Sequence, residues 1–180
     1  MRQDGARPTA ARLGDRVLAS LWDYLVVLGI LAVGGLVALT FHGPAALSVG
    51  QTDAVVLAAS VAPTWAYLTV SESAVQATWG KRCRRLQVIT VTGRRPGVAR
   101  CAVRNAVKLL PWQLAHVAVV RMVLEVDDVA LTAVAYVAGV ALAVTTVLTA
   151  WRTIDHRALH DLVAGTMVVP TPTNRVMLRR

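Results

Sequence analysis

The sequence has few cysteines and few acidic residues, and both shortages narrow the classes of protein to which it can belong. Only Cys83 and Cys101 are present in 180 residues, and neither has another cysteine or a histidine at the spacing of metal ligands. We expect two ordinary thiols, without a disulfide or a metal. The chain has ten acidic residues and 19 Lys and Arg, which gives a formal net charge of +9.

Motifs of catalysis are missing as well. The chain has no Ser/His/Asp order, no zinc-ligand cluster, no Walker loop and no Gly-rich dinucleotide fingerprint. His156 and His160 are four residues apart, but no third metal ligand lies near them in the sequence. We therefore expect neither an enzyme nor a bound cofactor.

Charged residues are absent from four long stretches of the chain. In agreement with this, 56% of the chain is hydrophobic and its mean hydropathy is +0.55. About 20 apolar residues suffice for a helix to cross a bilayer. The third stretch is short, so residues 106–124 cross only if Lys108 and Arg121 reach the two interfaces. The predicted fold is a single all-α integral membrane domain over residues 1–180, with about four transmembrane helices. The uncharged stretches are 24–41, 54–71, 109–120 and 129–151.

Basic residues gather in particular connections between these stretches. Nine lie within residues 81–108 with no acidic residue among them, while the connection between the first two stretches has none. The positive-inside rule predicts a cell-membrane protein with a basic cytoplasmic loop over 72–108 and cytoplasmic tails at 1–15 and 171–180. This placement argues against nucleic acid as the partner and favours anionic lipid headgroups.

The basic loop contains patterns of regular structure. Residues 85–91 alternate between polar and apolar, and 92–97 are rich in turn formers, which together predict a short β-hairpin. Residues 98–108 have the period of an amphipathic helix. We expect this helix to rest on the headgroups through Arg100, Arg104 and Lys108.

Beyond the last stretch, residues 156–169 combine charges with an apolar run too short to span a bilayer. We expect this segment to fold back. Asp161 would then reach basic residues near the inner ends of the helices and form a partly buried ion pair.

Asp23 is the first candidate for a functional residue, because it lies at the edge of the hydrocarbon, where an unpaired carboxylate is costly. It faces a cation, lines a wet cavity or holds a proton, unless it simply meets interfacial water. Arg16 precedes it by two helical turns, roughly 10 Å, which is too far for the two side chains to pair directly.

Gln113 and His116 are the polar residues of the third stretch, and they share a helix face with Trp112. One reading is a pair that titrates within a proton pathway, since histidine changes charge near neutral pH. The reading we favour is a hydrogen bond between helices.

Taken together, these segments resemble the RDD family of small membrane proteins, named for one arginine and two aspartates. Residues 16–23 look like its opening Arg and first Asp, and residues 161–166 look like its closing Asp motif. Residues 78–82 with Lys81 are similar to the family's Gly-Gln-Thr-Pro-Gly-Lys stretch. Gln76, Ala77 and Trp79 depart from that pattern. Arg100 with Arg104 and Asn105 resembles its entry to the next helix.

The resemblance implies a multi-span helical protein of the cytoplasmic membrane and, for some members, cation/proton antiport. We therefore expect a transporter or transport accessory in which Asp23 and Asp161 bind a cation or a proton alternately. Arg16 would tune the pKa values of these two aspartates. Four spans form a thin pathway, so we expect a homo-oligomer or a partner membrane subunit. The alternative is a non-catalytic scaffold or assembly subunit, in which the same residues lock the inner ends of the helices.

Overall fold

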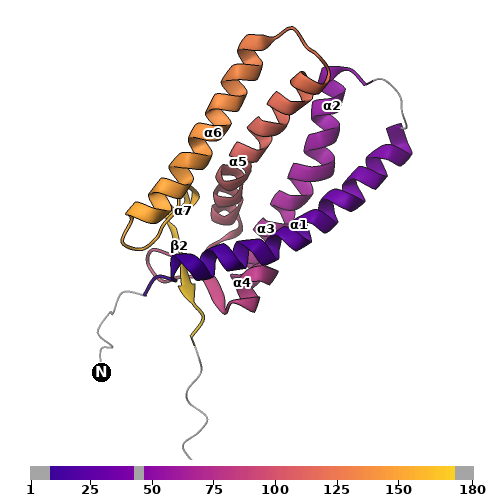
Figure 1. Cartoon of the computed structure of the whole chain (residues 1–180). Helices are drawn as coiled ribbons and strands as arrows, with labels where there is room; N and C mark the ends of the chain where they lie inside the picture. The colour runs from indigo at the N-terminus through magenta and orange to yellow at the C-terminus, as the bar shows by residue number, and fades with distance from the viewer. Residues whose placement is uncertain (1–8, 43–46, 173–180) are drawn as a thin grey trace, which may run out of the picture.

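The computed structural model describes residues 9–42 and 47–172; the outer parts of the two predicted tails, 1–8 and 173–180, lie outside this range. Four helical segments are long and apolar enough to cross a membrane, which confirms the four predicted stretches as helices (Figure 1). The second segment is built of three consecutive elements. The segments are α1 (Leu13–His42), then α2 (Val49–Val56) with η1 (Leu57–Val61) and α3 (Ala62–Val75), then α5 (Val98–Val123) and α6 (Val129–Arg152).

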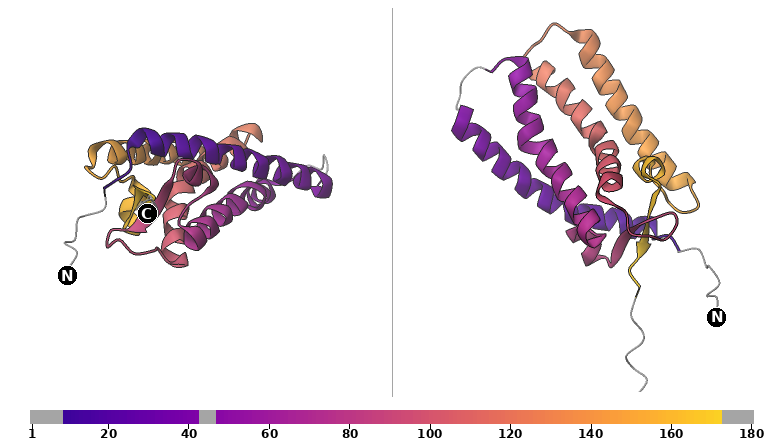
Figure 2. Two further views of the ribbon diagram at one scale, coloured as in Figure 1. Left: turned by 90° about the horizontal axis from the view of Figure 1, so that it is seen from below. Right: turned by 180° about the vertical axis from the view of Figure 1, so that it is seen from behind.

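The helix α5 lies at the centre of the arrangement, with α3 on one side and α6 on the other. The first helix, α1, packs against η1 and against the short helix α4 (Trp79–Cys83). Figures 1 and 2 show that α1 runs at an angle to the second segment. The two cross at η1, where Gly34 of α1 meets the carbonyl of Ala59.

The second segment changes its helical winding at the proline. Pro63 has no N–H, so the carbonyl of Ala59 has no α-helical donor. The chain forms a π-helical turn just before it, where the N–H of Ala62 donates to the carbonyl of Leu57. A Cβ on Gly34 of α1 would collide with the Ala59 carbonyl oxygen, so glycine is what lets α1 approach the freed carbonyl.

The third predicted span is a single continuous helix that is long and apolar enough to cross a membrane. Its helix α5 has 26 residues, so the predicted amphipathic helix over 98–108 is the first part of this helix and not a separate element. Arg121 lies near the end of this helix, where its Nη1 donates to Asp53 Oδ2 at 3.1 Å, while Lys108 lines two cavities inside the domain. Because α3 continues to Val75 and α5 begins at Val98, the basic loop that we placed at 72–108 is shorter and covers 76–97.

The face of α5 that we expected on the headgroups is turned partly inward, so that prediction is wrong. Arg104 is only 1% exposed, although Arg100 remains on the surface. The reason is that carboxylates of α3 and α7 (Leu159–Ala164) lie opposite Arg104, as described below.

The predicted hairpin is also wrong, although its first strand exists. The strand β1 (Leu86–Thr90) pairs antiparallel with β2 (Thr166–Pro170), with Val88 opposite Val168. The chain reaches this position because α7 ends at Gly165, whose φ of 61° turns it toward β1. Both valines are almost fully buried. The C-terminal segment therefore folds back as predicted, and it supplies the partner strand that we had placed locally.

A small apolar core holds this end together. The N-terminal segment joins the sheet, because the N–H of Ala11 donates to the carbonyl of Val168 at 2.9 Å. Three parts of the chain that are distant in sequence thus meet beside α4. The core side chains are Ala11, Ala19, Leu86, Val88 and Val168.

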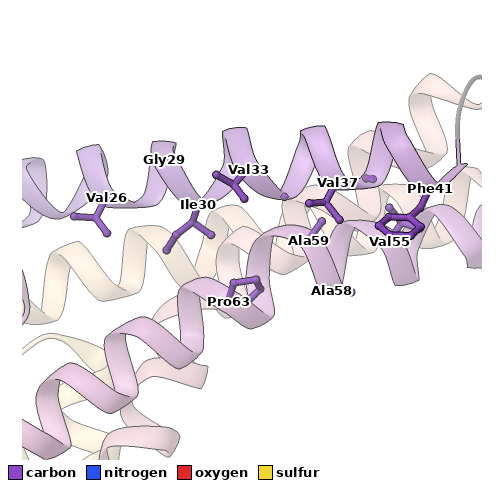
Figure 3. Close-up of a pocket in the computed structure, with 12 residues that line it drawn as sticks. Val26, Gly29, Ile30, Val33, Val37, Phe41, Val55, Ala58, Ala59 and Pro63 are labelled. Carbon is purple, nitrogen blue, oxygen red and sulfur yellow. The ribbon is translucent and has the colours of Figure 1, made fainter.

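Beside their crossing, α1 and the second segment border an apolar groove of about 730 Å³ (Figure 3). Ile30 and Val37 of α1 face it from one side, and Ala58 and Pro63 from the other. The last part of α1 is largely uncovered by the described chain, because Val33, Leu36 and Leu39 are each more than 60% exposed.

Candidate functional site: a buried network of alternating charges

A chain of six charged side chains crosses the α4 end of the helices, and we call it the charge network. Cations and carboxylates alternate along it, so every carboxylate has a cation beside it. The contacts in order are Arg16–Asp161 at 2.5 Å, Asp161–Arg104 at 3.0 Å, Arg104–Glu72 at 2.6 Å, Glu72–Lys81 at 3.0 Å and Lys81–Asp23 at 3.9 Å.

Asp161 is the fully buried carboxylate at one end of the network. Both Arg16 of α1 and Arg104 of α5 donate to it, and so does the hydroxyl of Thr166 at 3.1 Å. Burial alone would raise the pKa of Asp161, but the cations around it, Arg104 foremost, hold the pKa well below its usual range. This confirms that the folded-back segment brings Asp161 to basic residues of the helices.

His160, beside Asp161, is also buried. Removal from water lowers the pKa of His160 to about 3, so the ring is neutral at physiological pH. Its Nε2 lies 3.7 Å from Asp161 Oδ2, and its Nδ1 has no hydrogen-bond partner among the described residues.

Glu72, at the end of α3, is the middle carboxylate, and sequence reasoning missed it. Arg104 Nη1 donates to both of its oxygens at 2.6 Å, Lys81 Nζ lies 3.0 Å away, and Asn105 Nδ2 donates at 3.0 Å. One signal was available, because Glu72 is the only acidic residue between Asp53 and Glu125. A lone acid beside a strongly basic stretch predicts that several cations will gather around it.

Asp23 of α1 ends the network at the other side. It accepts hydrogen bonds from the Thr78 hydroxyl at 2.6 Å, the Gly80 N–H at 2.8 Å and the Tyr67 hydroxyl at 3.2 Å. It is 4% exposed, so the reading in which it simply meets interfacial water is wrong. As predicted, Asp23 does not pair directly with Arg16. The cation nearest to Asp23 is Lys81.

The N-terminus of α4 fits against α1 only because residue 80 is glycine. A Cβ at Gly80 would collide with the carbonyl oxygen of Ala19 and would lie 2.8 Å from the backbone nitrogen of Asp23. The same close approach lets the Gly80 N–H reach the Asp23 carboxylate. This is the physical use of the Thr-x-Gly-Lys pattern at 78–81.

Gln113 and His116 lie farther along α5 and are not part of the charge network. Gln113 Oε1 and His116 Nδ1 are buried without a partner among the described residues, so these atoms do not form the hydrogen bond that we favoured. His116 instead meets the ring of Trp112 edge-on at 5.4 Å. The structure thus joins Lys81, Arg104 and Asn105 to the three RDD-type residues and leaves Gln113 and His116 outside.

Two cavities adjoin the network. One, of about 180 Å³ between α1, α3 and α5, has Asp23, Lys108 and Trp112 in its wall. A smaller one, of about 70 Å³, is lined by Arg16, Lys81, Arg104, Lys108 and His160. Within residues 9–42 and 47–172, no group of three His, Cys, Asp or Glu side chains could hold a metal ion, and both cysteines are free.

The family comparison matches these elements. The model of the RDD family covers residues 10–165, a range that includes all six members of the charge network. Neither the curated proteins nor the solved structures contain a significant match to the chain. Since the family model covers most of its length and four of its helices can cross a membrane, this membrane protein belongs to the RDD family.

Proposed function

We propose that this protein is a cation transporter, or an accessory subunit of one, in which Asp23 is the carboxylate that exchanges its partners. The observation that carries the proposal is the position of Asp23. It lines the cavity of about 180 Å³, and its nearest cation, Lys81, is 3.9 Å away, the longest link in the network. Glu72 and Asp161 do not line this cavity, and each has cations at 3.0 Å or less.

A metal cation and a proton would compete for the same carboxylate. Either one removes the need for Lys81 at Asp23, because a carboxylate that is protonated or already paired attracts a second cation less strongly. Lys81 has an alternative partner at 3.0 Å in Glu72. When Lys81 leaves Asp23, no buried charge is therefore left without a partner, and the free-energy cost of the exchange stays low.

In this proposal Asp161 and Arg16 have other roles than the ones we first expected. Asp161 is fixed between Arg16 and Arg104, so we assign it to holding α7 against α1 and α5. Arg16 acts on Asp161 and has no contact with Asp23 among the described residues. We therefore place the exchange at Asp23 alone.

We also propose that the α4 end faces the cytoplasm. The connection over 76–97 has six Lys and Arg and no acidic residue, whereas the connection between α5 and α6 contains three acidic residues. The positive-inside rule then puts both tails and the basic loop inside the cell, next to anionic headgroups of the cell membrane.

A second subunit would complete the pathway. Four helices enclose little space, and the apolar groove between α1 and the second segment is open along one side of the molecule (Figure 3). We propose that the protein works as a homo-oligomer or with a partner membrane protein.

A scaffold is the second candidate, and the complete pairing of the buried carboxylates favours it. All three buried carboxylates are paired, and the contacts tie α1, α3, α4, α5 and α7 together at one end. An assembly subunit needs this rigidity and no exchange. In that case loss of Asp23 lowers stability and changes no flux.

The test is flux in proteoliposomes that contain the full-length protein and a trapped pH dye. We expect a pulse of sodium, potassium or lithium to move protons with the wild type and not with Asp23→Asn. The control is Asp53→Asn, which changes a carboxylate in a partly exposed pair with Arg121 and is expected to keep the flux.

Each outcome decides between the two candidates. Loss of flux in a monodisperse Asp23→Asn protein supports the transporter. Equal flux in Asp23→Asn and the wild type removes Asp23 from the pathway. No flux with any of the three ions in the wild type rejects transport by the isolated protein and favours the scaffold.

A further inference from the structure

The smaller cavity beside the charge network has an unusual wall. Four cationic side chains line it, contributed by α1, α4 and α5, and no acidic residue does so among the described residues. Three of these cations contact the carboxylates of the charge network. The cations are Arg16, Lys81, Arg104 and Lys108.

Lys108 differs from the other three cations. In the part of the chain that the structure describes, it has no carboxylate within 4.0 Å and makes no hydrogen bond. It lines both the smaller cavity and the cavity next to Asp23. Lys108 is half-buried, and a partly dehydrated cation without a carboxylate partner favours a bound anion.

The charges of the cluster do not balance without one. The three carboxylates are neutralised by Arg16, Lys81 and Arg104, and Lys108 adds one further positive charge. His160 adds none, because its buried ring is neutral. The excess is therefore a single charge, and one monovalent anion would cancel it.

Two neutral polar residues line the same space. One is His160, which is 7% exposed and whose Nδ1 has no partner among the described residues. The other is Ser20. A neutral imidazole with its proton on Nδ1 and a hydroxyl both donate hydrogen bonds to an anion.

The size of the cavity limits the ligand. It measures about 70 Å³, and by this measure one water molecule takes roughly 10–15 Å³. A halide ion with a few waters fits. A large organic anion such as gluconate does not.

From these observations we propose that this cavity binds a small inorganic anion, of which chloride is the representative, between Lys108, His160 and the cations of the charge network. The bound anion would neutralise Lys108 and stabilise the folded protein. The site does not depend on transport at Asp23, because its readout is stability and not flux.

The experiment measures the midpoint of thermal unfolding of the purified full-length protein in zwitterionic detergent, with sodium chloride compared to sodium gluconate at equal ionic strength. We expect chloride to raise the midpoint of the wild type by roughly 3–6 °C at a tenfold excess over its Kd. Lys108→Met should lose this response and, in gluconate, should unfold at a higher temperature than the wild type, because the unpaired charge is gone.

The matched control is Arg82→Met, which removes an exposed cation next to Lys81 on α4 and should keep the response to chloride. Line broadening of the ³⁵Cl NMR signal by the wild type, and its loss in Lys108→Met, gives a second readout that does not depend on unfolding. An equal chloride response in the wild type and Lys108→Met overturns the proposal, and so does no response in the wild type. A response to added phosphatidylglycerol in place of chloride would also overturn it, because the anion would then be a lipid headgroup.

Discussion

The two ends of the helices hold their charges in different ways. At the α4 end, three buried carboxylates pair with Lys81, Arg104 and the partly buried Arg16, and these contacts connect five helices. At the opposite end, Arg121 and Asp53 form one pair that is partly exposed and joins α5 only to α2. Burial removes the screening by water, so the same kind of contact has much greater structural weight at the α4 end.

The helix packing follows the same contrast. The first helix is held at the α4 end by Asp23 and Arg16, whereas its other half borders the apolar groove toward α2. The lesson is that buried charge pairs connect the helices at one end of this membrane domain, while apolar contacts and one partly exposed ion pair connect them toward the other end.

The largest expected effect comes from removing the centre of the network. Arg104→Leu leaves Glu72 and Asp161 short of a buried partner, and loss of one partner of a buried pair costs about 3–5 kcal/mol. We expect the protein to unfold at much lower denaturant concentration in micelles, as followed by tryptophan fluorescence. Arg104→Lys should recover part of the stability, because it restores the charge without the two-pronged contact to Glu72.

Stability that is unchanged in Arg104→Leu would contradict the comparison between the two ends. It would mean that Lys81 and Arg16 alone satisfy the two carboxylates.

Acidification is expected to weaken the α4 end through His160. Burial lowers the pKa of His160 to about 3 in the folded protein from about 6.5 in the unfolded chain, so the unfolded state binds more protons between these values. Stability is therefore complete above pH 6.5 and falls as the pH drops toward 3. We expect the thermal midpoint of the wild type to decrease between pH 7 and pH 5, and His160→Gln to show a smaller decrease over the same range.

Asp161 acts in the same direction at lower pH. Its pKa is lowered in the folded protein by Arg104 and Arg16, so the stabilisation from its charge is present above pH 4 and is lost below it. A wild type and a His160→Gln protein with identical profiles between pH 7 and pH 5 would show that His160 contributes nothing in that window.

The smallest effect is expected at the opposite end. Arg121→Met breaks the pair with Asp53, which is partly exposed, and exposed pairs contribute roughly 0–1 kcal/mol. The denaturation midpoint should shift little compared with that of Arg104→Leu. A loss as large as that of Arg104→Leu would erase the difference between the two ends on which the comparison rests.

Parts of the site were predictable because they follow from local rules. The fold-back that carries Asp161 was expected, since the apolar run at 156–169 is too short to cross a bilayer. Asp23 was expected to need a partner because of its place at the edge of the hydrocarbon. Neither rule says which residue becomes the partner.

The errors have a common cause. Thr78 reaches Asp23 over 55 residues, and Arg16 reaches Asp161 over 145 residues. The strand β1 had a suitable turn after it, yet it pairs with β2, about 80 residues away, because that pairing buries Val88 and Val168 together. Arg104 turned inward for the same kind of reason, since Glu72 and Asp161 lie on that side.

The sequence by itself determined the four apolar helices, the membrane as their solvent, the family and the need to neutralise the aspartates, because length, hydropathy and motif spacing are properties of neighbouring residues. Only the tertiary structure decided that Glu72 is the middle carboxylate, that Arg16 serves Asp161 and not Asp23, and that Lys108 has no carboxylate within reach among the described residues. Ion pairs form over about 3 Å, and which groups come that close depends on how whole helices pack against one another.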